Sequence, residues 1–265
     1  MPERRRLALL IEYDGADFHG YQEQGELRTV QQVVQATLRD LTGEADLEIF
    51  GSSRTDQGVH ARGLVCHVDT ACAVPVDRLP LAMNSRLPAD VALLAAAEVD
   101  PGFHARHDAI GKIYTYRYYL SSARPVLARN QAAHVFGPVD QAAMERAIPL
   151  LIGTHDFNAF MDHNNNPRKT TIRTLQSLHL SREGPLLTLT VHGNGFLYHM
   201  VRILAGTLLY IGQGKIAAED IPAILSSRNR RLAGKTMPPQ GLCLDAVLYP
   251  SDPFHTIPAP DGGQK

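Results

Sequence analysis

The sequence lacks tryptophan and contains only three cysteines among its 265 residues. Cys66, Cys72 and Cys243 are odd in number and include no C-x-x-C pair, which argues against a disulfide framework and a cysteine-based zinc site. Unpaired cysteines are typical of a reducing compartment. We therefore expect a cytoplasmic protein.

Long apolar runs and a strong net charge are also missing. No apolar stretch approaches the ~20 residues needed to cross a bilayer, and Glu12 ends the first apolar run too early for a signal peptide. The formal net charge is -1, so binding of a nucleic acid would depend on local arginine clusters. We expect no membrane association.

The apolar patterns predict alternating strands and helices, and 44% hydrophobic residues are enough for a sizeable core. Thr29 is the predicted cap of the first helix, and Gly43 ends it. The predicted elements are a strand at residues 7–13, the helix that follows Thr29, a helix at 77–86, strands at 91–99 and 112–120, a helix at 141–151, strands at 171–180 and 186–191, a long apolar helix at 196–211 and a strand at 242–248.

The order of these elements is similar in the two parts of the chain. We therefore predict an α+β fold of two similar α/β halves, with mostly antiparallel sheets flanked by helices. The halves are expected at residues 1–104 and 105–250. Residues 251–265 are rich in proline and glycine and are predicted to form a disordered tail.

The loop at residues 51–63 contains one carboxylate, two guanidiniums and an imidazole between two apolar runs. Thr-Asp-x-Gly is ordinary turn chemistry, in which the side chain of Asp56 accepts backbone N–H groups. Alternatively, Asp56 is a functional carboxylate held at the end of a sheet. Arg54 and Arg62 favour the second interpretation, because an ionised carboxylate in a dry cleft requires a cation and a turn requires none.

Two further groups of residues carry chemistry. Tyr114, Tyr116 and Tyr118 would share one face of a strand, either as a stripe of the core or as a surface that stacks on a nucleobase. Arg202 lies on an apolar helix face, and a buried arginine needs a carboxylate. Asp56 is the candidate partner.

Cofactor motifs are incomplete. Gly234-Lys235-Thr236 resembles the end of a phosphate loop, but the earlier glycine is missing, and Gly193-Asn194-Gly195 lacks the third glycine of a dinucleotide fingerprint. The histidines show no metal-ligand spacing with a carboxylate partner. We expect neither a cofactor nor a metal.

Several short motifs, taken in order, resemble those of the tRNA pseudouridine synthase A family over the chain to about Pro250. They are Ile11-Glu12-Tyr13-Asp14-Gly15 with Gly20-Tyr21-Gln22, Arg54-Thr55-Asp56-Gln57-Gly58-Val59-His60, Phe103-His104-Ala105-Arg106, Lys112-x-Tyr114-x-Tyr116, Gly153-Thr154-His155-Asp156-Phe157, Phe196-x-x-His199-Met200-Val201-Arg202 and Gly241-Leu242.

The resemblance implies isomerisation of uridine to pseudouridine at positions 38 to 40 of the tRNA anticodon arm, without cofactor or metal. It also implies a homodimer and an active-site cleft between the two halves. By matching position, Asp56 is the catalytic carboxylate and Arg202 its ion-pair partner, Tyr114 stacks on the target base, and Leu242 forms an apolar wall. Arg54 is implied to help hold the flipped nucleotide, and Arg62 is expected to bind RNA.

Three residues depart from the usual motifs of the family. Tyr21 stands where tryptophan is common, Ser53 where glycine is common and Leu64 where glutamine is frequent. We expect these residues to adjust RNA contacts. Two alternative functions remain open, a catalytically silent RNA-binding module and a nucleosidase or glycosylase that admits water.

Overall fold

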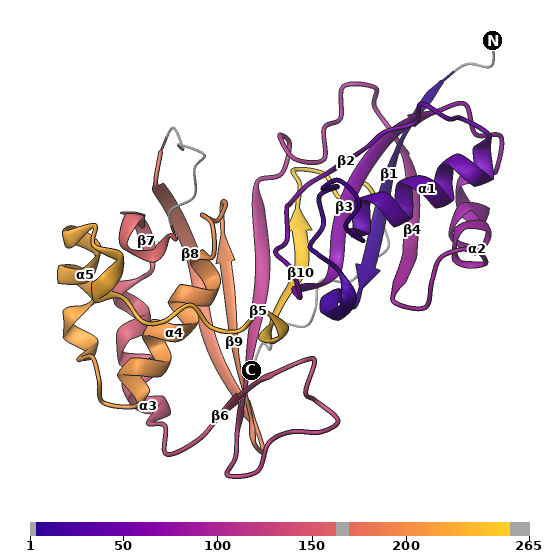
Figure 1. Ribbon diagram of the computed structural model, residues 1–265. Coiled ribbons are helices and arrows are strands. Elements are labelled where there is room, and N and C mark those ends of the chain that lie inside the picture. The colour runs from indigo at the N-terminus through magenta and orange to yellow at the C-terminus, as the bar shows by residue number, and fades with distance from the viewer. Residues whose placement is uncertain (1–3, 163–169, 255–265) are drawn as a thin grey trace.

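A single sheet runs through the whole molecule (Figure 1). The computed structural model describes residues 4–162 and 170–254. Within that part of the chain the sheet has ten strands in the order β4-β1-β3-β10-β5-β9-β8-β7, and β2 pairs with β3 and β6 with β5. The strands are β1 (Arg5–Tyr13), β2 (Ile49–Gly51), β3 (His60–Thr70), β4 (Val91–Val99), β5 (Gly111–Leu120), β6 (Ala133–Val135), β7 (Gly153–Asp156), β8 (Ile172–Glu183), β9 (Leu186–Gly193) and β10 (Leu242–Leu248).

The helices form two groups, one beside each end of the sheet (Figure 1). In the N-terminal half α1 (Val30–Thr42) and α2 (Leu79–Asn84) lie beside β1–β4, whereas α3 (Gln141–Ala147), α4 (Met200–Gly212) and α5 (Ile221–Ser227) lie beside β8 and β9. One hydrophobic core extends under both groups, from Leu7 on β1 to Ile221 on α5. The predicted α+β fold with a mostly antiparallel sheet is confirmed.

The last strand, β10, joins the two halves. It pairs in parallel with β3, where Cys243 lies opposite His60, and antiparallel with β5, where Leu244 lies opposite Tyr114. The backbones of β3 and β10 approach so closely that a Cβ atom on Gly63 would lie 2.4 Å from the carbonyl oxygen of Asp245. Residues from the end of the chain therefore complete the seam between the segments 1–104 and 105–250.

Local sequence signals set the boundaries of the first helix. The hydroxyl of Thr29 accepts a hydrogen bond from the backbone N–H of Gln32 at 3.4 Å, and Gly43 closes the helix at a φ of 74°. A residue without a Cβ atom adopts this left-handed conformation without steric cost. The predicted helix between Thr29 and Gly43 is confirmed.

Three other predicted helices are shorter than expected. The helix predicted at 77–86 is α-helical only at Leu79–Asn84, after a 3-10 turn at Val76–Arg78. The helix predicted at 141–151 is α-helical only to Ala147 and continues as a 3-10 turn at Ile148–Leu150, because Pro149 has no N–H to donate. The helix predicted from Phe196 begins at Met200, since His199 lies in the left-handed region at a φ of 58°. Residues 194–199 are thus a loop before α4.

The prediction of a disordered tail is wrong for its first residues. Phe254 is buried against Ala8, Leu10, Val65 and Ala105 on the sheet. The high proline and glycine content of this segment predicted disorder. It did not show that the aromatic side chain of Phe254 would pack against an apolar surface. Residues 255–265 lie outside the described part of the chain.

Candidate active site

The loop that carries Asp56 connects β2 to β3 and is fixed by its backbone. The N–H of Tyr21 donates to the carbonyl of Thr55 at 3.1 Å, and the N–H of Val59 donates to the carbonyl of Asp56 at 3.2 Å. Gly58 provides the turn with a φ of 76°. The turn is therefore closed by backbone groups, which leaves the carboxylate of Asp56 available for other contacts.

Asp56 makes those contacts with residues from the other half of the chain. Nη1 of Arg202 on α4 lies 3.4 Å from Oδ2 of Asp56, although 146 residues separate the two positions. Nε of Arg202 donates to the carbonyl of Met237 at 2.7 Å, which fixes the guanidinium. The structure thus brings together the two residues that sequence reasoning paired, and the Asp56 side chain is not the cap of its own turn.

A pocket of about 620 Å³ opens in front of Asp56. Tyr114 of β5, Leu242 at the start of β10 and Arg54 all line it. The ring of Tyr114 is 8% exposed and meets the ring of Phe196 edge to face, with a centroid distance of 5.1 Å. Burial raises the pKa of Tyr114 above its usual range, and the charge of Asp56 acts in the same direction, so the phenol stays neutral.

The three tyrosines predicted to share one strand face differ in their surroundings. The hydroxyl of Tyr116 donates to the carbonyl of Pro238 at 2.9 Å, and the hydroxyl of Tyr118 donates to the carbonyl of Ala205 at 2.8 Å. Both rings are fully buried in the core. The core interpretation therefore holds for Tyr116 and Tyr118, and only Tyr114 reaches the pocket.

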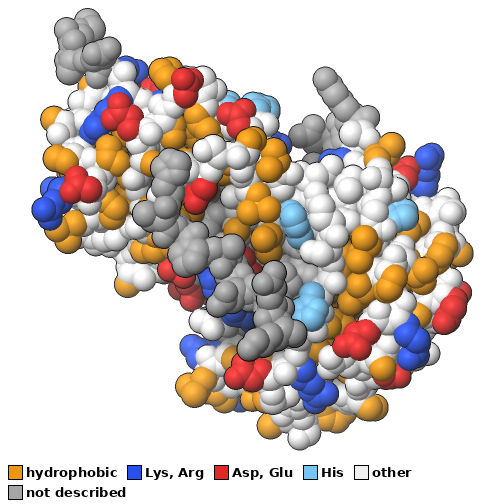
Figure 2. Space-filling model, turned by 180° about the vertical axis from the view of Figure 1, so that it is seen from behind, with side chains coloured by type: hydrophobic (Ala, Val, Ile, Leu, Met, Phe, Trp, Pro, Cys, Tyr) orange, Lys and Arg blue, Asp and Glu red, His pale blue; other side chains and the backbone are white. Residues whose placement is uncertain are grey.

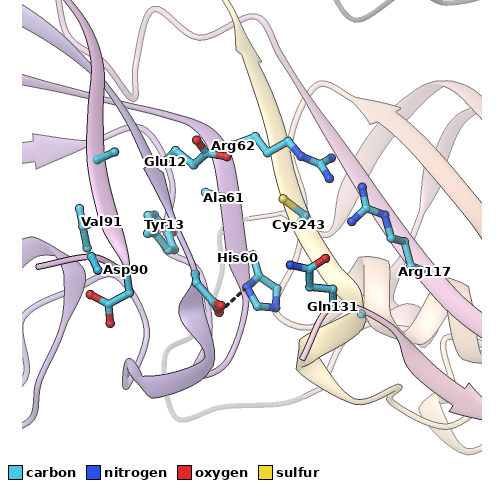
Figure 3. A pocket seen from close by; sticks show the side chains of 14 residues that line it. Glu12, Tyr13, His60, Ala61, Arg62, Asp90, Val91, Arg117, Gln131 and Cys243 are labelled. Carbon is cyan, nitrogen blue, oxygen red and sulfur yellow. Dashed lines mark ion pairs between the residues drawn. The ribbon is translucent and has the colours of Figure 1, made fainter. Parts of the chain in front are cut away.

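Arg62 does not line the Asp56 pocket. It pairs with Asp245 at 2.7 Å and lines a separate cavity of about 350 Å³ together with Arg117 and Cys243 (Figure 3). Cys243 follows Leu242 on β10, and neighbouring residues of a strand point to opposite faces of a sheet. The structure therefore places Arg62 on the other face of the sheet from Asp56, and the expectation that Arg62 binds RNA gains no support from the Asp56 pocket.

His199 is a residue of the site to which sequence reasoning gave no role. Nε2 of His199 lies 3.4 Å from Oδ2 of Asp56, and Nδ1 lies 2.8 Å from Oδ2 of Asp162. The sequence did contain a signal, because His199 precedes Arg202 by three residues and residues at that spacing meet on one side of a helix turn. No sequence pattern placed its partner Asp162 at the site, because Asp162 follows a 3-10 turn and lies 37 positions before His199 in the chain.

Asp162 is itself held by two further donors. Nε of Arg230 and the hydroxyl of Thr236 donate to its oxygens, each at 2.8 Å. Burial acts to raise the pKa of Asp162, but the hydrogen bonds from His199, Thr236 and Arg230 outweigh it and hold the pKa at about 2. Asp162 is therefore ionised at neutral pH.

Lys112 is a second residue of the pocket that was not assigned a role. It lies two residues before Tyr114 on β5, and its Nζ donates to the carbonyl of Ser52 at 2.8 Å. Burial lowers the pKa of Lys112 to about 8, with a smaller effect from Arg106. Residues two positions apart on a strand share one face of the sheet. The spacing of Lys112 and Tyr114 is therefore the signal that could have placed Lys112 at the site.

The three departures from the usual motifs occupy different environments. Tyr21 is 3% exposed and Leu64 is fully buried, and both belong to the core. The expectation that they adjust RNA contacts is wrong for these two, because neither side chain reaches the surface. Ser53 is also buried but lines the Asp56 pocket.

Acidic and basic side chains are intermixed over the face shown in Figure 2. Among residues 4–162 and 170–254, no group of three or more His, Cys, Asp or Glu side chains is placed to hold a metal ion. In the same residues no helix has the length and apolar character of a membrane span.

Known proteins of similar sequence share a single description. A family model described as tRNA pseudouridine synthase matches residues 9–108 and 147–250. A protein of Halalkalibacterium halodurans named tRNA pseudouridine synthase A is 47% identical over 238 residues, which are 90% of each chain. Proteins with the same name are 43% identical in Acetivibrio thermocellus and 45% identical in Moorella thermoacetica, each over 92% of this chain and 100% and 99% of the relative.

A solved structure with a distant likeness is the Cbf5-Nop10-Gar1 complex. It matches with a TM-score of 0.37 and 12% sequence identity, and the match covers 89% of this chain and 56% of that chain.

Proposed function

The chain belongs to the tRNA pseudouridine synthase family, and we propose that Asp56 is the carboxylate with which it isomerises uridine. The relatives that match nearly the whole chain are named tRNA pseudouridine synthase A. The protein is accordingly an isomerase that converts uridine in tRNA to pseudouridine. The observation that carries the proposed role of Asp56 is its position in a pocket, paired with Arg202 from the other half of the chain.

The reaction explains why a carboxylate and a cation are needed together. The bond between N1 and C1′ must break, the uracil must turn while it is held, and C5 must bond to C1′ and release its proton. An ionised carboxylate can attack the ribose as a nucleophile or remove a ribose proton as a base. Arg202 supplies the opposite charge that a partly buried carboxylate requires.

The remaining pocket residues have proposed roles in binding the nucleotide. The volume of about 620 Å³ suits a single nucleotide. The ring of Tyr114 stacks on the target base, and Leu242 forms the apolar wall that excludes water. Arg54 helps to hold the flipped nucleotide, because flipping costs a few kcal/mol that contacts with the RNA must offset.

Finer features of the function rest on the family resemblance. We propose that the enzyme modifies positions 38 to 40 of the anticodon arm, acts as a homodimer in the cytoplasm and requires no metal. Exposed apolar side chains on either side of β6, Val126 and Leu127 before it and Phe136 after it, are candidates for a subunit contact. Light scattering of the purified protein would measure its mass, and the mass of a monomer at micromolar concentration would contradict the dimer.

The decisive experiment follows the hydrogen of C5. The wild-type protein is incubated with tRNA that carries 5-tritiated uridine, and released tritium is counted. We expect release by the wild type and none by Asp56→Asn, while both bind tRNA equally well. Tight binding without release by the wild type would indicate a binding module, and free uracil would indicate a glycosylase.

Metal dependence is tested in the same assay. Exhaustive chelation should leave the rate of tritium release unchanged. A loss of activity that added metal restores would contradict the metal-free proposal.

A further inference from the structure

An imidazole lies between two carboxylates beside the reaction centre. Nδ1 of His199 lies 2.8 Å from Asp162 and Nε2 lies 3.4 Å from Asp56. The ring of Tyr198 stacks on the imidazole, with centroids 3.8 Å apart and planes at 25°. The imidazole is therefore held through Nδ1 and on one face, with Nε2 directed toward Asp56.

The hydrogen bond to Asp162 orients the imidazole of His199. A carboxylate accepts hydrogen bonds and donates none, so Nδ1 carries a proton toward the ionised Asp162. With Nδ1 held in this way, Nε2 lies 3.4 Å from Oδ2 of Asp56.

We propose that His199 is a positioning residue, whose Nε2 lies against the carboxylate of Asp56 and orients that carboxylate toward the nucleotide. The proposal rests on the proposed role of Asp56 in the reaction. Arg202 and His199 both approach Oδ2, which leaves Oδ1 without a hydrogen-bond partner among the described residues. Oδ1 is then the oxygen that faces the substrate.

Charged and polar groups from several elements surround His199. Asp56 faces it from the loop before β3, Asp162 faces it from the segment after β7, and Arg202 lies one turn further along α4. Arg230 and Thr236 reach the imidazole only through Asp162. The imidazole is thus a bridge between the loop of Asp56 and a separate hydrogen-bonded group around Asp162.

Two substitutions of His199 by amides distinguish a role in positioning Asp56 from a role in supporting the backbone before α4. In His199→Asn the amide can replace Nδ1 and contact Asp162, and asparagine tolerates the left-handed backbone at this position well. In His199→Gln the longer amide can replace Nε2 and contact Asp56. A positioning role predicts that kcat falls about 100-fold in His199→Asn and less than about 10-fold in His199→Gln, with KM and tRNA binding unchanged in both.

The opposite order would contradict the proposal. If His199 only supports the loop before α4, the asparagine variant retains more activity than the glutamine variant, and thermal unfolding follows the same order. Full activity in both variants would also overturn it. The wild type and Asp56→Asn are measured in parallel, so an inactive wild type refutes the proposed function, whereas active His199 variants refute only the positioning role.

Discussion

Gly206 lies in the middle of α4, where two opposing effects decide the outcome of Gly206→Ala. Alanine is favoured over glycine in a helix interior by about 1 kcal/mol, which alone predicts a more stable protein. However, a Cβ atom at this position would lie 1.8 Å from the carbonyl oxygen of Lys235, and that oxygen belongs to the backbone. The helix or the segment around Lys235 would have to move by about 1 Å or more to restore ordinary contact.

The steric cost exceeds the gain in helix propensity. Insertion of a methyl group into a well-packed interior costs about 1–3 kcal/mol, and the upper end applies where backbone must move. We therefore expect Gly206→Ala to lower the free energy of unfolding by about 2 kcal/mol. The same segment holds the site, because the carbonyl of Met237 accepts from Nε of Arg202 and Thr236 binds Asp162. A displacement of about 1 Å should reduce kcat about 10- to 100-fold.

Urea unfolding measures the stability and tritium release measures kcat. Gly212→Ala is the matched control at the end of the same helix, where a Cβ atom would meet side-chain atoms of Val139 and Met144 at 2.8–3.0 Å. These side chains can rotate, so we expect a change below about 1.5 kcal/mol and an unchanged kcat. A Gly206→Ala variant that is as stable and as active as the wild type would refute the reasoning.

Three further outcomes are expected. Tyr114→Ala should lower kcat/KM by about 10- to 100-fold, because stacking on a base contributes about 1–3 kcal/mol, while Tyr114→Phe should lose little; equal losses would contradict stacking. Arg54→Ala should raise KM for tRNA. Arg62→Ala should leave kcat and KM nearly unchanged, since Arg62 lies on the other face of the sheet. An effect of Arg62→Ala as large as that of Arg54→Ala would place RNA on both faces. The folded pKa of Asp162, about 2, lies below its unfolded value of about 4. Its contribution to stability is therefore present above about pH 4 and lost as the pH falls toward 2; urea unfolding between pH 5 and 2 should show a smaller loss for Asp162→Asn than for the wild type.

Several elements could be predicted because their causes are local. Thr29 and Gly43 determine both ends of α1, and the strands β4 and β10 match the predicted residues 91–99 and 242–248. The pairing of Asp56 with Arg202 follows from burial, since a guanidinium on an apolar helix face needs a carboxylate. Such arguments need only the residue types and their spacing.

Other features could not be predicted, because strand alternation gives two faces but not what covers each face. Tyr114, Tyr116 and Tyr118 are equivalent in the sequence, but the segment at Pro238 and α4 cover the latter two and leave Tyr114 at the pocket. The expectation for Phe254 failed for a similar reason. Its apolar partners include Ala8 and Leu10 on β1 and Val65 on β3, which are far away in the sequence.

The sequence by itself determined most of the longer elements, the caps of α1, the family and the pairing of Asp56 with Arg202. Only the tertiary structure decided that β10 joins the halves, that Arg62 lies away from Asp56 and that His199 connects Asp56 to Asp162. Caps and apolar periodicity act between residues a few positions apart, so they can be read from the sequence. The site depends on the register of distant strands and on one left-handed residue before α4, and packing between the two halves fixes both.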